Sequence, residues 1–192
     1  DQELQMYINI IRRHINDIQK IITEFVDFSK MPTPIFEEQN IVSIIEEIIS
    51  SRQIINEYIS YKFNSTLNEI KFACDVSQIH QMMINLLKNA EEAISRNASS
   101  KGMINTIISL DKDELCISIE DNGHGFVQQD IHKIADAYIT TSANGAGLGL
   151  SIVKKIVYDH SGELVIANNK LGGGLIKLLF PAKSLLEKIK KL

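Results

Sequence analysis

Two asparagines and a lysine at helical spacing are the first place where this sequence could bind a ligand. In Asn85-Leu86-Leu87-Lys88-Asn89-Ala90, Asn85 and Asn89 lie one turn apart and point the same way. A neutral amide oxygen can complete an octahedral Mg²⁺ shell beside a polyphosphate without adding negative charge, and Lys88 could meet a phosphate. The alternative is that these residues form only the polar face of an amphipathic helix.

Two glycine-containing clusters follow along the chain. Asp121-Asn122-Gly123-His124-Gly125 ends a strand-like run, and its carboxylate could accept a hydrogen bond from the exocyclic amine of adenine. Gly145-Ala146-Gly147-Leu148-Gly149-Leu150 precedes a helical pattern, where free amides could bind phosphate. A turn without a ligand and a glycine hinge are the alternatives. The order of all three clusters, each in a fitting context, predicts a pocket for a nucleotide and Mg²⁺.

Composition bounds the class of protein. With 192 residues, 44% hydrophobic and 23% charged, the sequence is typical of a soluble globular domain with an appendage. A net charge of −4 gives no electrostatic reason to expect nucleic acid as a partner. Cys74 and Cys116 lie far apart in strand-like contexts, which predicts reduced thiols rather than a disulfide or a zinc site. The chain begins inside a helical pattern, so we expect a piece of a longer protein.

Residues 1–30 carry an apolar heptad repeat that predicts a long helix of the coiled-coil type, in need of a partner helix. Met31-Pro32-Thr33-Pro34 ends this helix, because proline removes a donor and restricts the preceding residue. We therefore expect a division between residues 1–31 and a domain of residues 32–192. The seam consists of Leu4, Ile8, Ile11, Ile15, Ile18, Ile22 and Phe25.

The remaining patterns mix hairpins with helices and predict an α+β fold, a two-layer α/β sandwich with helices on one face of a mixed sheet. Asn40 or Ser43 should cap one helix and Asp75 the next. We expect the strands at 54–64 and 69–74 to be neighbours, and those at 103–110 and 114–120 to form a hairpin. Helices are expected near 40–51, 75–96, 127–135, 148–160 and the C-terminus, and further strands at 35–38, 163–168 and 174–180. The buried side of the second helix should comprise Ile79, Met82, Met83, Leu86, Leu87, Ala90 and Ile94.

In this order the three clusters resemble the N, G1 and G2 boxes of the catalytic ATP-binding domain of sensor histidine kinases, the Bergerat (GHKL) ATPase fold. The N box corresponds to residues 85–90, the G1 box to 121–125 and the G2 box to 145–150. The resemblance extends over roughly residues 35–182. Residues 25–34 also resemble the end of the dimerisation hairpin in nitrogen-regulation kinases of the NtrY/NtrB kind, so residues 1–31 would be the second helix of a partial hairpin.

The resemblance implies ATP and Mg²⁺ as cofactors. Asn89 would be the magnesium ligand, and Asp121 would read adenine. A lid at residues 136–144 would close over the nucleotide. The residues that bind the cofactor would be Asn85, Lys88, Asn89, Asp121, Gly123, Gly125, Tyr138, Thr140, Thr141, Gly145, Gly147, Leu148 and Gly149.

The sequence departs from the family at three positions. Ala137 and Ser142 stand where the lid often has proline and a cation, which should loosen the loop and remove a phosphate contact. Gly174 stands where the family often has threonine or alanine. A non-catalytic dimerisation and docking module with a degenerate pocket is therefore one alternative. Another GHKL ATPase is a second, although the short spacing between the G1 and G2 boxes argues against it.

No histidine has the His-Glu/Asp-x-x-Asn/Thr-Pro setting in which the family accepts phosphate, and His14 is followed by Ile15-Asn16-Asp17 without a proline. The resemblance thus implies an ATP-dependent protein-histidine kinase portion without catalytic residues of its own. It would transfer the ATP γ-phosphoryl group to a histidine outside this chain, for relay to a response regulator. Further implied partners are the histidine-bearing dimerisation helix of the same kinase and a second copy in a homodimer. By family habit, it would be the cytoplasmic portion of a sensor anchored in the inner membrane.

Overall fold

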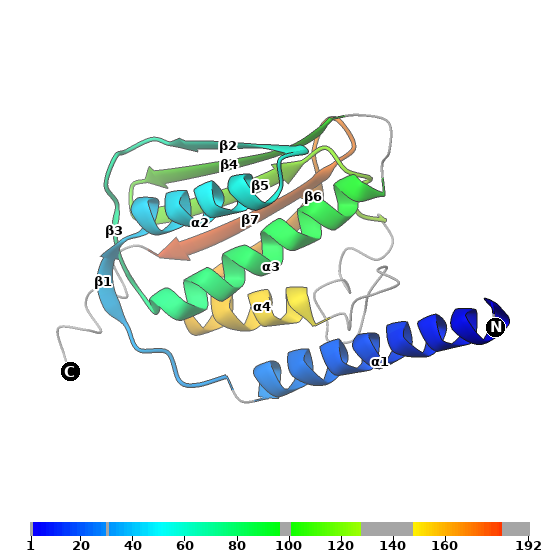
Figure 1. The fold of residues 1–192 in the computed structure, drawn as a ribbon. Helices are drawn as coiled ribbons and strands as arrows, with labels where there is room; N and C mark the ends of the chain where they lie inside the picture. The colour runs from blue at the N-terminus through cyan, green and yellow to red at the C-terminus, as the bar shows by residue number, and fades with distance from the viewer. Residues whose placement is uncertain (1, 30, 97–100, 128–147, 182–192) are drawn as a thin grey trace.

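The computed structural model describes residues 2–29, 31–96, 101–127 and 148–181, which form four helices and seven strands (Figure 1). The elements are α1 Gln2–Ser29, β1 Glu37–Asn40, α2 Ile41–Ile55, β2 Ile59–Ser65, β3 Lys71–Cys74, α3 Val76–Ser95, β4 Gly102–Asp111, β5 Glu114–Asp121, α4 Gly149–Asp159, β6 Glu163–Asn168 and β7 Gly174–Pro181. The helices predicted at 127–135 and at the C-terminus fall almost wholly outside the described residues. Among the described helices, none is long and apolar enough to cross a bilayer.

A five-stranded mixed sheet, in the order β2-β4-β5-β7-β6, forms one layer of the domain. β2 and β4 run parallel, and every other neighbouring pair is antiparallel, including the predicted β4–β5 hairpin. α2, α3 and α4 lie together over one face of the sheet in Figure 1. The predicted two-layer sandwich is therefore confirmed.

The core lies between the sheet and the three helices, and α3 contributes its expected face. Strand residues alternate in burial, as a half-covered sheet requires. All seven residues predicted for the inner side of α3 are at most 8% exposed. They are Ile79, Met82, Met83, Leu86, Leu87, Ala90 and Ile94. Cys74 and Cys116 are free thiols, as the sequence predicted.

The expected pairing of residues 54–64 with 69–74 is wrong. β3 instead pairs antiparallel with β1 in a separate two-stranded sheet, while β2 pairs with β4. The cause lies at the start of α2, where the side chain of Asn40 caps the helix by accepting a hydrogen bond from the backbone N–H of Val42. The same Asn40 oxygen accepts the backbone N–H of Ile70, which ties the residue before β3 to the end of β1.

The boundary between α2 and β2 also differs from the prediction. α2 continues to Ile55 rather than ending near Ser51, and β2 begins only at Ile59. Ile54 and Ile55 are 78% and 69% exposed in the last helical turn. Their apolar character therefore marks neither a strand nor the core, although the alternation of apolar and polar residues from Ile54 onward predicted a strand.

The linker between α1 and the domain lies against the start of α3. The Pro32 carbonyl accepts a hydrogen bond of 3.1 Å from the Gln78 side chain, and the Ile35 backbone N–H donates to the Asp75 carboxylate at 2.8 Å. Asp75 also caps α3, as predicted, by accepting the Gln78 backbone N–H at 3.1 Å. The Asp75 carboxylate thus caps α3 and also holds the linker. We call the cluster of Pro32, Ile35, Asp75, Gln78 and His160 the linker joint.

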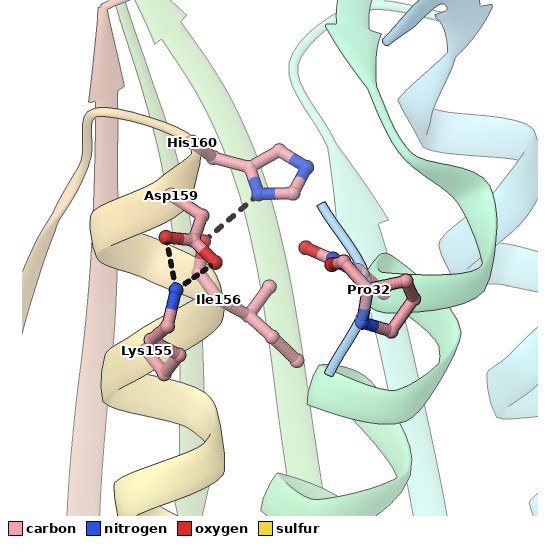
Figure 2. Close-up of polar contacts among 6 residues, drawn as sticks. Pro32, Lys155, Ile156, Asp159 and His160 are labelled. Atoms are coloured by element: carbon pink, nitrogen blue, oxygen red, sulfur yellow. Dashed lines mark hydrogen bonds and ion pairs between the residues drawn. The ribbon is translucent and has the colours of Figure 1, made fainter. Parts of the chain in front are cut away.

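His160 brings the end of α4 into the linker joint (Figure 2). Its fully buried ring accepts the Asp75 backbone N–H at Nε2 and donates from Nδ1 to the Ile156 carbonyl. Because the backbone N–H must donate, the ring carries its proton on Nδ1 and is neutral. Burial lowers the pKa of His160, and the Phe36 ring packs edge-on at 5.0 Å between centroids.

Candidate nucleotide-binding site

The two asparagines on the polar side of α3 are less exposed than residues on a fully solvent-exposed helix face. Asn85 and Asn89 are half-buried, whereas Lys88 is exposed. The side-chain nitrogens of both asparagines are buried and have no hydrogen-bond partner in the described part of the chain. A buried donor without a partner costs about 1–3 kcal/mol, so such a pair calls for an explanation beyond the fold. Two amide groups aimed at a ligand provide one.

The following turn of α3 is fixed to its neighbours through Glu91. The Arg52 guanidinium on α2 makes a two-point ion pair with this carboxylate, and the Tyr61 hydroxyl on β2 donates to it at 2.6 Å. Both charged side chains are less than 15% exposed, so water screens the pair weakly. Burial, followed by the hydrogen bond to Glu91, raises the pKa of Tyr61 to about 12. The helix that carries the asparagines is therefore held at a fixed depth against α2 and β2.

The G1 box turns directly against α3. Asp121 ends β5, and its Oδ1 accepts backbone N–H groups from Gly123 at 2.8 Å and Gly174 at 3.2 Å. A Cβ atom on Gly123 would lie within 2.8 Å of the backbone of Ala93. Glycine is thus required for this close approach, which places the adenine-reading candidate beside the N-box helix.

The described part of the G2 box starts α4 opposite Asn89. Leu148 is fully buried and precedes the helix, whose first residue is Gly149. A Cβ atom on Gly149 would lie 3.7 Å from the Asn89 side-chain oxygen. The first amide groups of α4 lack helical acceptors and carry partial positive charge, so the candidate metal ligand faces an end that favours an anion.

The structure brings together the described members of the predicted site. Asn89 lies beside Gly149, Asn85 is one turn away on α3, and Gly123 contacts the end of the same helix. The other predicted residues, Tyr138, Thr140, Thr141, Gly145 and Gly147, lie outside the described residues. Two asparagines of the β6–β7 turn, residues 168–174, were not predicted from the sequence. Asn169 donates to the Asp121 carbonyl in the G1 box, and Asn168 binds Phe126, the residue that follows the box. Their one signal was an Asn-Asn pair shortly before three glycines.

A mixed sheet covered on one face by helices, with an asparagine-bearing helix facing a glycine-started helix, defines an ATP-binding domain of the Bergerat class. The chain belongs to the family of histidine kinase-, DNA gyrase B- and HSP90-like ATPases, whose model matches residues 74–184. Within that family, its relatives include sensor histidine kinases of the NtrY-like kind. The predicted family is therefore confirmed.

Both sequence and structure relatives support this assignment. An NtrY-like sensor histidine kinase from Rickettsia conorii is 43% identical over 190 residues, which cover 99% of this chain and 31% of that protein. The catalytic domain of the histidine kinase ThkA is 26% identical with a TM-score of 0.68, over 77% of this chain and 96% of that domain. ThkA in complex with the response regulator TrrA matches 94% of this chain and 52% of that kinase chain, with 26% identity and a TM-score of 0.75. The chain thus spans less than a third of the Rickettsia relative.

Proposed function

We propose that this chain is the ATP-binding catalytic portion of a sensor histidine kinase, which presents the γ-phosphoryl group of ATP to a histidine outside these residues. The phosphoryl group would then pass to a response regulator, by analogy with the ThkA complex. The histidine-bearing dimerisation helix of the same kinase and a second copy of the chain would be the other partners. By analogy with sensor kinases, the portion would face the cytoplasm below an inner-membrane anchor.

The unpartnered amide nitrogens of Asn85 and Asn89 carry this proposal. Their position beside the start of α4 suits a polyphosphate with a divalent cation, since an amide offers both a donor and a neutral oxygen. Asn89 would hold Mg²⁺ through its oxygen, and Asn85 would donate to a phosphate oxygen. When bound, Mg²⁺ partly neutralises the phosphate charge that develops during phosphoryl transfer.

The other residues of the site would orient the nucleotide. Asp121 would accept a hydrogen bond from the exocyclic amine of adenine through the carboxylate oxygen that the backbone leaves free. The first amides of α4 would receive the phosphates. Lys88, which is exposed on α3, would reach a phosphate from the solvent side.

Calorimetric titration of ADP and a non-hydrolysable ATP analogue, with and without Mg²⁺, tests the pocket. We expect binding that strengthens with Mg²⁺ and an Asn89→Ala variant that loses the Mg²⁺-dependent part. Gln81→Ala, on an exposed position of the same helix, should bind as the unchanged chain does. An unchanged chain that binds no nucleotide at millimolar concentration would favour the docking module instead.

Incubation with ATP followed by mass spectrometry tests the missing acceptor. We expect no phosphohistidine on this chain, although His14 is exposed on α1. A phosphohistidine at His14 would overturn the proposal that the acceptor lies elsewhere.

A further inference from the structure

The turn between β6 and β7, residues 168–174, grips the G1 box through asparagine side chains. Asn169 accepts the backbone N–H groups of Leu171 at 2.9 Å and Gly173 at 3.0 Å, which closes the turn on itself. Its side-chain nitrogen donates to the Asp121 carbonyl at 2.7 Å, across 48 residues of sequence. A single side chain therefore shapes the turn and holds the backbone of Asp121.

Asn168 holds the other end of the same loop. Its side-chain oxygen accepts the Phe126 backbone N–H at 2.6 Å, and its nitrogen donates to the Phe126 carbonyl at 2.8 Å. Between these two anchors, Gly125 has a φ of +67° and approaches the turn so closely that a Cβ atom would lie 2.3 Å from the Gly172 carbonyl. The turn thus holds the first residue of the G1 box and the residue that follows the box.

Gly174 acts on the Asp121 carboxylate itself. Its backbone N–H donates to Oδ1, and a Cβ atom at this position would lie 2.5 Å from Oδ2 and 3.2 Å from the Phe126 ring. The φ of Gly174 is not positive, so the missing side chain matters for space and not for backbone strain. The carboxylate occupies room that a side chain on β7 would fill.

We propose that the β6–β7 turn is the positioning device for Asp121, in which Asn169 holds its backbone and Gly174 its carboxylate, and that this turn sets the selectivity for adenine. Asn169 and Gly174 are positioning residues, because they act through Asp121. The inference rests on the proposed function, in which Asp121 reads the base.

Selectivity follows from how the two carboxylate oxygens are used. Oδ1 already accepts two backbone N–H groups, while no residue of the described chain donates to Oδ2. Oδ2 is therefore left for the exocyclic amine of adenine. Hypoxanthine has a carbonyl oxygen at that position, and a fixed carboxylate would repel it. A carboxylate that could turn away would lose this discrimination.

The test compares ADP with IDP by calorimetry in the presence of Mg²⁺. We expect the unchanged chain to bind ADP about a hundredfold more tightly than IDP. Asn169→Asp keeps the acceptor that closes the turn but loses the donor to the Asp121 carbonyl. Gly174→Leu crowds the Asp121 carboxylate with a side chain larger than the threonine or alanine that the family often has at this position. Each should weaken ADP binding about tenfold and reduce the ADP/IDP ratio. Leu171→Ala is the matched control, since this side chain is 88% exposed in the same turn.

Thermal unfolding of each variant separates selectivity from stability. The φ of Gly174 is not positive, so we expect Gly174→Leu to remain folded at the temperature of the titration while its ADP/IDP ratio falls, a result that a merely structural role would not give. An ADP/IDP ratio that stays unchanged in both variants would overturn the inference. If Asn169→Asp fails to fold, Gly174→Leu alone decides. An unchanged chain that binds ADP and IDP equally would instead overturn the role of Asp121 in the proposed function.

Discussion

Asn85 and Asn89 illustrate how a single residue can serve a ligand at the expense of the fold. The side-chain nitrogen of each is buried and donates no hydrogen bond to a described residue. The opposite face of the same helix is buried in the core. Asparagine also has a lower helix propensity than alanine by about half a kcal/mol. Both terms oppose folding, so the residues are better explained by a bound nucleotide than by stability.

Replacing Asn89 with alanine should therefore raise stability while it removes binding. We expect the free energy of unfolding to increase by about 0.5–1 kcal/mol, because an unsatisfied donor disappears and a better helix former takes its place. Urea unfolding without nucleotide measures the change, with Gln81→Ala as the control for a truncation at an exposed position of the same helix. A decrease of more than about 1 kcal/mol would mean that the amide supports the fold.

At the scale of elements, the linker joint connects both helices of the site to α1. α3 starts at the joint and carries the asparagines, while α4 ends there and presents its first turn to Asn89. Lys155 and Asp159 form an ion pair one turn apart along α4 (Figure 2), and a pair with a half-exposed lysine adds little stability. The buried neutral ring of His160 is the sensitive part of the joint.

Stability should accordingly fall as the pH drops below about 6.5. Burial lowers the pKa of His160 in the folded chain, so the unfolded chain takes up the proton first, and the stabilisation present above the ordinary histidine pKa is lost as the pH falls through the lowered one. Asp75 faces the ring. Burial tends to raise its pKa, but its hydrogen bonds from Ser77, Ile35 and Gln78 outweigh this and lower it below 3.8, so its contribution is lost only in stronger acid.

Urea unfolding at about pH 7.5 and about pH 5.5 measures this dependence. His160→Asn should be less stable at the higher pH and should lose less on acidification, because its side chain does not titrate. Equal slopes for the unchanged chain and His160→Asn would contradict the role of the buried ring.

At the scale of the whole molecule, the periodicity of apolar residues predicted the local elements, but it did not predict contacts between residues far apart in the sequence. The helix faces and the β4–β5 hairpin follow from local patterns, and so does the Asp75 cap. The β1–β3 pair did not, because Glu37–Asn40 contains no apolar residue and its partner is set by the Asn40 side chain. The hydrogen bond from the Asn169 side chain to the Asp121 backbone carbonyl joins residues 48 positions apart, and the spacing of apolar residues gives no signal of such a contact.

The described apolar side chains of α1 do not pack against the core of the domain. None of its described side chains belongs to the core. Six of the seven predicted seam residues are 40–62% exposed, namely Leu4, Ile8, Ile11, Ile15, Ile18 and Ile22. Such a continuous stripe on one helix is unfavourable in water and is typical of a surface that pairs with another helix.

We therefore expect the chain to self-associate through α1. Sedimentation equilibrium at about 10–100 micromolar should detect dimers or larger species, and a double change of Ile11 and Ile18 to aspartate should give a monomer, because two charges would be buried in the seam. Asn9→Asp adds a charge on the opposite side of the same helix and should leave association intact. Since α1 contributes nothing to the described core, the double variant should keep its nucleotide affinity. A chain that remains monomeric over this range would show that the stripe requires a different helix as its partner.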